Sequence, residues 1–272
     1  MLERQNFMIK AFATVCFFLL AVSAMAESPS PGIVKDIAPS GRLRAAINFG
    51  NPVLAQRDPV TGEPRGVSAE LARELAARLG VPVDFVTFET AGKVFEALKS
   101  GAWDLAFLAI DPVRAAEIDF TAPYVIIEGT YAVPESSPFQ STAEVDREGV
   151  RIAAGRGTAY DLYLTRALKN AELVRAPTSQ AGLEMFLADK LNVAAGVRQP
   201  LVAFAAEHSG IRVLPDRFMV IEQAMGMPKG RDAGAEYVRS FIEDLKASGF
   251  VANALLESGQ AEATVAPPAA VR

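Results

Sequence analysis

The chain has 272 residues, of which 50% are hydrophobic and 22% charged, and its formal net charge is −5. This composition suits a globular protein with a substantial core, long enough for one large domain or two modest ones. The acidic balance argues against a nucleic-acid-binding protein, which would normally carry a basic face.

The N-terminus has the order of a secretory signal peptide. Basic Arg4 and Lys10 precede an apolar run over residues 11–22, and small residues follow up to Ala26. We therefore predict that residues 1–26 are cleaved and that the protein is periplasmic. The alternatives are an uncleaved anchor, for which the run is short of the roughly 20 residues that span a bilayer, and a lipoprotein, which would need a small residue just before Cys16. Cys16 is the only cysteine, so the mature chain would have no disulfide and no thiolate metal ligand.

The next part of the chain alternates strands with helices, which is typical of an α/β domain. Residues 27–40 are rich in Pro and Ser and predict a flexible leader. Ser68 and Gly80 are the expected N-cap and end of a helix whose leucines share one face. The predicted strands are residues 42–49, 81–88 and 103–110, and the predicted helices are residues 68–80 and 91–101.

A second α/β series of similar size follows, joined to the first by extended segments near Tyr131 and Ala224. If the closing helices return to the first unit, the backbone crosses twice, and a ligand would bind between the carboxyl ends of the strands. The predicted strands are 149–155, 171–176, 191–197 and 211–214, and the predicted helices are 158–170, 178–190, 200–209, 232–249 and 251–256. The predicted division is 41–131 plus 226–259 for lobe 1, 132–225 for lobe 2, and 260–272 for a disordered tail.

Arg114 lies in an unusual place, because the Asp111-Pro112 pair before it predicts the start of a helix. A cation in the first turn opposes the helix dipole by about 0.5 kcal/mol. It becomes useful when an anion arrives, since arginine can pair with a carboxylate through two hydrogen bonds. The alternative is a surface ion pair of Arg114 with Asp111 or Glu117, which would contribute little.

Two further strand ends have a similar design. Gly155 and Gly157 permit a tight turn after one strand, and Thr158 could cap the next helix with Asp161 in a capping box. The exposed amides there could hold an anion and Thr158 could donate a hydroxyl hydrogen, although ordinary helix capping explains the same pattern. Arg198 ends another apolar strand, where the alternative is a solvated side chain. Two arginines at three such ends favour a ligand with negative charge.

The chain resembles the family 3 solute-binding proteins, the periplasmic receptors of polar amino-acid ABC transporters. The resemblance runs over residues 41–259 and is most specific in LKSGAWDLAFLAIDPVRAAEIDFTAPY, residues 98–124. Residues 65–86, 149–161 and 222–230 also match family segments. The resemblance implies a two-lobed fold of the type II periplasmic-binding-protein kind, each lobe a mostly parallel sheet flanked by helices, with two hinge crossings and closure on the ligand.

The resemblance also implies a function and a set of site residues. The protein would capture a small anionic or zwitterionic solute and deliver it to a membrane ABC permease, as a monomer and without a cofactor or metal. Arg114 would bind the ligand carboxylate, with Thr158 assisting from the other lobe. The remaining expected ligand-binding positions are Asn48, Phe49, Ala109, Asp111, Gly157, Arg198 and Gln223.

Several departures from the family pattern bear on the ligand. Ala109 stands where a hydroxyl residue is usual, and Val197 stands where an Asp usually accepts the α-ammonium of an amino acid. A buried ammonium without a partner costs several kcal/mol. Our hypothesis is therefore a ligand that is anionic or lacks an ordinary α-amino group. Glu128, Asp111 or Glu222 could supply a substitute acceptor, which leaves amino acids open.

Two other functional classes remain as alternatives. Some relatives of this fold are periplasmic dehydratases of cyclohexadienyl acids, which need a positioned acid or base. His208, the only histidine, is expected at the exposed end of a helix, and no catalytic triad or metal cluster is evident, so we expect no enzyme. A sensory module is the third class, but the last predicted helix lies close to the end of the sequence, so we expect a freely diffusing transport receptor instead.

Overall fold

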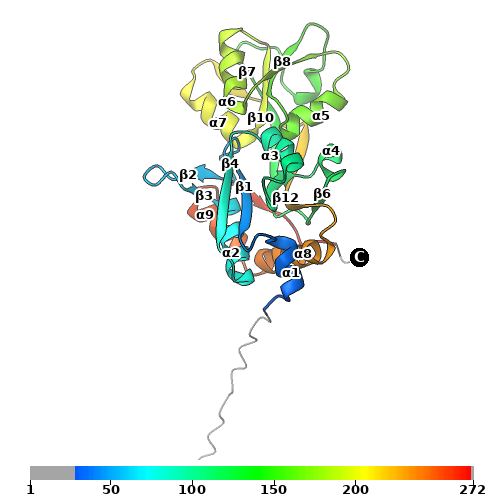
Figure 1. The fold of residues 1–272 in the computed structure, drawn as a ribbon. Coiled ribbons are helices and arrows are strands. Elements are labelled where there is room, and N and C mark those ends of the chain that lie inside the picture. The colour runs from blue at the N-terminus through cyan, green and yellow to red at the C-terminus, as the bar shows by residue number, and fades with distance from the viewer. Residues whose placement is uncertain (1–27, 271–272) are drawn as a thin grey trace, which may run out of the picture.

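The computed structural model describes residues 28–270, which form two α/β lobes stacked one above the other (Figure 1). This confirms the predicted fold class. The predicted signal peptide and Cys16 lie outside the described residues. Within residues 28–270, no helix combines the length and the apolar character needed to cross a membrane.

The first lobe is a mostly parallel sheet with helices on both faces. Its strands are β1 (Leu43–Asn48), β4 (Val83–Phe88), β5 (Leu105–Ala109) and the short β6 (Ile118–Phe120), with a hairpin of β2 (Gln56–Arg57) and β3 (Pro64–Arg65). Its helices are α1 (Pro31–Ile37), α2 (Val67–Leu79), α3 (Ala91–Ala97), α4 (Pro112–Ala115), α8 (Asp232–Ala247) and α9 (Phe250–Glu257), with a 3-10 turn at Leu98–Ser100. Strand β1 lies between β4 and β5 and is parallel to both.

The core of this lobe contains the leucines whose spacing predicted helix α2. Leu71 and Leu75, which share a face of α2 as predicted, are fully buried against the sheet. Trp103 is buried on the opposite face of the sheet, where its indole N–H donates to the carbonyl of Val94 at 2.8 Å. Ser68 is not the N-cap. Helix α2 begins at Val67 after Gly66, and the Ser68 hydroxyl is instead buried 3.1 Å from the Tyr124 hydroxyl.

The second lobe repeats the design with its own core. Its strands are β8 (Arg151–Gly155), β9 (Glu172–Ala176), β10 (Val193–Val197) and β11 (Ile211–Val213). Its helices are α5 (Ala159–Ala167), α6 (Ser179–Ala188) and α7 (Arg198–Glu207), with a 3-10 turn at Thr142–Glu144. Strand β8 lies between β9 and β10 and is parallel to both.

Two long strands, β7 (Val125–Pro134) and β12 (Met219–Pro228), join the lobes into one sheet of order β4-β1-β5-β12-β7-β10-β8-β9. They pair antiparallel with each other, while β12 also pairs with β5 and β7 with β10. Tyr131 belongs to the core of the second lobe, whereas Ile221 and Met225 belong to that of the first. The two crossings therefore fall a few residues before the predicted positions near Tyr131 and Ala224.

The predicted flexible leader and disordered tail are both wrong within the described residues. Residues 31–37 form α1, which begins with Ser30 as N-cap and lies against α8 (Figure 1). The fully buried Ile37 of α1 lies next to Gly234 of α8. In the tail, β13 (Thr264–Val265) pairs with β7. Buried apolar residues, Ile37 in the leader and Ala266 in the tail, stabilise these two segments.

Candidate functional site

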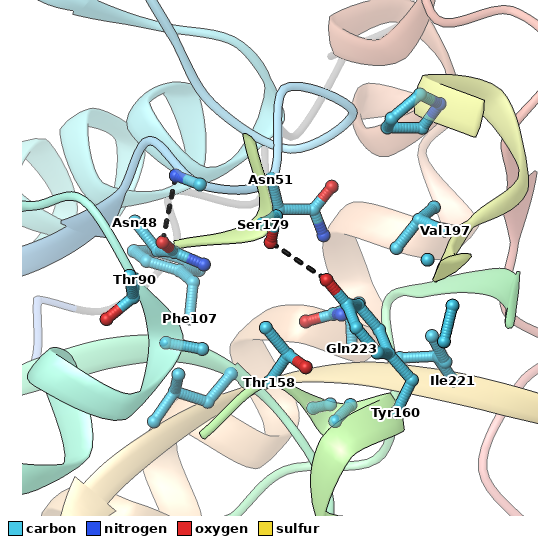
Figure 2. Close-up of a pocket in the computed structure, with 18 of the residues that line it drawn as sticks. Asn48, Asn51, Thr90, Phe107, Thr158, Tyr160, Ser179, Val197, Ile221 and Gln223 are labelled. Carbon is cyan, nitrogen blue, oxygen red and sulfur yellow. Dashed lines mark hydrogen bonds between the residues drawn. The ribbon is translucent and has the colours of Figure 1, made fainter. Parts of the chain in front are cut away.

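A cavity of about 60 Å³, large enough for several water molecules, lies between the lobes at the carboxyl ends of their strands. Both lobes line it, and Figure 2 shows its polar side chains converging on the space. The first lobe and the crossing strands contribute Asn48, Gly50, Asn51, Thr90, Ala91, Phe107, Leu108, Ala109, Arg114, Ile221 and Gln223. The second lobe contributes Thr158, Ala159, Tyr160, Ser179, Leu183, Ala195, Gly196, Val197, Pro200 and Leu201.

Arg114 is the one charged side chain among these described lining residues, and it is 1% exposed. The local sequence places it as predicted, because Asp111 caps α4 by accepting from the Val113 amide at 2.9 Å and Pro112 opens the helix. Its Nη1 donates to the Ala109 carbonyl at 3.0 Å and its Nη2 donates to the Gly157 carbonyl at 2.8 Å. Its Nε is buried without a hydrogen-bond partner.

The surroundings of Arg114 leave its charge largely uncompensated. Burial lowers the pKa of Arg114 to about 10, and the Asp111 carboxylate acts weakly in the opposite direction. The guanidinium is therefore still charged at neutral pH. Arg114 does not form the alternative surface ion pair with Asp111 or Glu117. The hydrogen bonds of its guanidinium nitrogens go only to backbone carbonyls.

The lobes touch each other beside Arg114, so the structure is closed. Gly157 of the second lobe approaches Gly92 of α3 so nearly that a Cβ on Gly157 would lie 2.7 Å from the Gly92 Cα. An ion pair of 2.6 Å joins Arg166 of α5 to Asp111 of the first lobe. Together with the bond from Arg114 to the Gly157 carbonyl, these contacts span the cleft.

Further polar groups surround the cavity. The Asn48 Oδ1 accepts from the Gly50 amide at 3.0 Å, while the Tyr160 hydroxyl lies 2.9 Å from the Ser179 hydroxyl (Figure 2). Burial raises the pKa of Tyr160, which keeps its hydroxyl neutral. The side-chain Oδ1 of Asn51 is buried without a partner. These groups can hydrogen-bond a ligand but carry no negative charge.

Five predicted site residues line the cavity: Arg114, Ala109, Asn48, Thr158 and Gln223. Thr158 caps α5 as predicted, but its hydroxyl donates to the Gly155 carbonyl at 2.8 Å, so its hydrogen is not free for a ligand. The capping box is incomplete, because the Asp161 carboxylate accepts from the Gly157 amide and not from that of Thr158.

Four predicted site residues lie outside the cavity lining. Phe49 and Arg198 each follow a lining residue, and successive residues near a strand end point to opposite sides. Phe49 therefore lies under the Arg57 guanidinium at 4.0 Å, and Arg198 pairs with Glu128 at 2.7 Å. Asp111 caps α4 and pairs with Arg166, and Gly157 contacts the opposite lobe through its backbone.

The sequence reasoning missed several lining residues. Phe107 lies in the predicted strand 103–110, and this 3% exposed side chain belongs to the core and also lines the cavity. Thr90 and Ser179 each lie shortly after a strand, as the predicted residues Arg114 and Thr158 do. Tyr160 lies on α5 directly after the predicted Thr158 turn. Asn51 gave no signal, because a polar residue in a Pro/Gly-rich loop is ordinary.

No lining residue within the described chain is Asp or Glu. The three proposed substitutes for an ammonium acceptor all lie elsewhere. Glu128 pairs with both Arg198 and Arg217, which lowers its pKa. Asp111 pairs with Arg166, and Glu222 is exposed on β12.

Comparison with known proteins agrees with this architecture. The family model for bacterial extracellular solute-binding proteins, family 3, matches residues 44–256. The chain is similar to the solute receptor for L-cysteine of Neisseria gonorrhoeae, with 23% identity, a TM-score of 0.72, and coverage of 83% of this chain and 92% of that one. No curated protein matched the sequence.

Two further structures have the same fold. One is an amino acid ABC transporter substrate-binding protein from Streptococcus pneumoniae bound to L-arginine, with 21% identity, a TM-score of 0.71, and coverage of 86% of this chain and 99% of that one. The other is the ancestral amino acid-binding protein AncCDT-1, a precursor of cyclohexadienyl dehydratase, with 21% identity, a TM-score of 0.69, and coverage of 82% and 97%.

Proposed function

The chain belongs to the family 3 bacterial extracellular solute-binding proteins, and we propose that it captures a small carboxylate-bearing solute between its lobes and delivers it to an ABC permease. The observation that carries this proposal is Arg114. It lines the cavity between the lobes, it is buried, and its Nε has no partner.

The physical argument concerns the cost of a buried charge. Removing a cation from water costs several kcal/mol unless an opposite charge or enough hydrogen bonds compensate it. Two carbonyls accept from Arg114, but they carry only partial charges. A carboxylate at the Nε edge would supply the missing negative charge and a charge-assisted hydrogen bond.

Closure would follow from ligand binding because Arg114 contacts both lobes. Its Nη1 bond stays within the first lobe, and its Nη2 bond reaches the Gly157 carbonyl of the second. A ligand that neutralises the guanidinium would lower the cost of burying it, and the guanidinium is buried only in the closed form. The differential affinity for the closed form would then shift the population toward closure.

We propose binding without turnover. The lining residues that can exchange protons are Arg114 and Tyr160, and burial moves the pKa of Tyr160 further above neutrality. General acid–base catalysis works best with a group whose pKa is near the working pH. A dehydratase would therefore have to use a group from outside this cavity.

The remaining parts of the proposal rest on sequence and family. The positive, apolar and small-residue order before Glu27 supports export to the periplasm with cleavage after Ala26. The family supports a permease partner, and we propose that the receptor is a monomer. We assign direct ligand contact to Arg114, Asn48 and Gln223, with the Ala109 and Gly157 carbonyls positioning the guanidinium.

The test is a calorimetric titration of the purified mature protein with short-chain carboxylic acids and with their uncharged amides. We expect at least one acid to bind and its amide not to bind. Arg114→Ala should abolish that binding, whereas Arg198→Gln, at the predicted arginine that lies outside the cavity, should retain it. Equal binding of an acid and its amide, or an unaffected Arg114→Ala variant, would contradict the proposal.

A further inference from the structure

Two residues that line the same cavity each have a buried polar atom without a hydrogen-bond partner. One atom is the Nε of Arg114, which can only donate, and the other is the Oδ1 of Asn51, which can only accept. Asn51 is 9% exposed, and Figure 2 shows its carboxamide among the side chains that line the cavity. Buried polar atoms are almost always hydrogen-bonded, so each unpaired one needs an explanation.

The two atoms make opposite demands on a ligand. Arg114 requires negative charge, while Asn51 requires a hydrogen-bond donor. An α-amino acid has both a carboxylate and an ammonium donor, and a hydroxy acid has both a carboxylate and a hydroxyl donor. The choice between these classes depends on whether the site can compensate a second, positive charge.

The acidic side chains around the site already form ion pairs with arginines of the protein. Asp161 accepts from the Gly157 amide and pairs with Arg175 at 2.8 Å. Asp111 pairs with Arg166 and Glu128 with Arg198, and none of these four residues lines the cavity. An ammonium would therefore find only neutral acceptors, in a space that already holds the Arg114 guanidinium.

The balance of charge favours a single negative charge on the ligand. Arg114 gives the lining a charge of +1. A monoanion brings the closed site to neutrality, whereas a zwitterion leaves the same +1 and adds the desolvation of its ammonium. That desolvation costs several kcal/mol when no carboxylate compensates it.

Resting on the proposed function, we infer that the ligand is a small hydroxy carboxylate, held by Arg114 at its carboxylate and recognised by Asn51 through its hydroxyl. The hydroxyl satisfies the Asn51 oxygen at a much lower desolvation cost than an ammonium. The apolar part of the lining, which includes Phe107, Leu183 and Leu201, suits a compact hydrocarbon body.

The experiment uses probes that share a carbon skeleton and differ only beside the carboxylate. The mature protein is titrated with lactate, pyruvate and alanine, and with the same three classes built on the valine and phenylalanine skeletons. We expect one hydroxy acid to bind at least tenfold more tightly than its oxo and amino partners. Asn51→Leu should remove the preference of hydroxy over oxo acid, and its melting temperature checks the fold.

Asn51→Asp supplies a second readout, because it places a carboxylate where an ammonium could be accepted at almost unchanged side-chain volume. We expect it to lose the hydroxy acid and to gain at least tenfold in affinity for the amino acid of the same skeleton. Tightest binding of an oxo or amino acid by the natural protein would overturn the inference while leaving the proposed function intact. Failure of every carboxylate to bind would overturn both.

Discussion

Gly92 should determine whether the lobes can close. It is the second residue of α3, and it meets the backbone of the opposite lobe at Gly157, which has a positive φ of 71°. A Cβ at Gly92 would lie 3.2 Å from the Arg156 carbonyl oxygen and 3.2 Å from the Gly157 Cα. In Gly92→Ala, these contacts are tighter than ordinary van der Waals contact, and they exist only in the closed form.

The size of the effect follows from two opposing terms. Overpacking a close contact costs about 1–3 kcal/mol, and here the closed form alone bears it. Alanine is also a better helix former than glycine by up to about 1 kcal/mol, which stabilises the open and closed forms equally. We therefore expect Gly92→Ala to weaken ligand binding by about 5- to 150-fold while leaving the melting temperature of the free protein equal or higher.

Gly32→Ala is the matched control. Gly32 is also the second residue of a seven-residue helix, α1, and a Cβ there would have only the Ser30 hydroxyl oxygen nearby, at 3.8 Å. Calorimetry measures affinity, and small-angle X-ray scattering measures compaction on adding ligand. If Gly92→Ala binds and compacts like Gly32→Ala, the two lobes do not meet at this contact and the reasoning is wrong.

Two further ion pairs give separate predictions. Arg166→Gln removes the ion pair with Asp111 that joins the lobes. Ligand dissociation measured by stopped flow should therefore accelerate by about two- to five-fold at low salt. An unchanged dissociation rate at low salt would exclude a role of this ion pair in closure. Hydrogen bonds and charge from Arg198 and Arg217 lower the pKa of Glu128 in the folded protein. The Glu128 carboxylate therefore stabilises the folded protein fully above its unfolded pKa, about 4.3. This stabilisation is lost as pH falls through the folded pKa. Glu128→Gln should therefore lower the melting temperature at neutral pH, and the difference from the natural protein should shrink toward zero as pH falls through the lowered folded pKa of Glu128. A difference that does not change with pH would contradict this.

Regular elements could be predicted because their patterns are local. The leucine spacing of α2 and the Asp111-Pro112 start of α4 depend on residues close in sequence, and both are confirmed. The position of Arg114 in the cleft also followed from its place after a buried strand. Strand-to-helix alternation over the whole chain was enough to give the fold class.

The errors arose where the answer depends on distant residues. Whether Phe49 or Asn48 faces the ligand depends on the register of β1, and a one-residue change exchanges the two sides. The ion pair between Arg198 and Glu128 could not be predicted, because 70 positions separate the two residues in the sequence. The burial of α1 depends on α8, almost 200 residues further along the chain.

Arg114 links ligand charge to lobe closure, and this link can be measured. Its Nη2 reaches the Gly157 carbonyl only when the lobes are closed, beside the contact that Gly92→Ala would force apart. Arg114→Lys retains the charge but cannot span both carbonyls and a ligand, because lysine lacks the planar fork. In a Gly92→Ala background, the hydrogen bond from Arg114 to the Gly157 carbonyl is already weakened. Arg114→Lys should therefore cost less affinity there than in the natural protein. The affinity lost by the double variant should therefore fall short of the summed single losses by about 0.5 kcal/mol or more. If the affinity losses of the two single variants add exactly in the double variant, Arg114 binds the ligand independently of lobe closure.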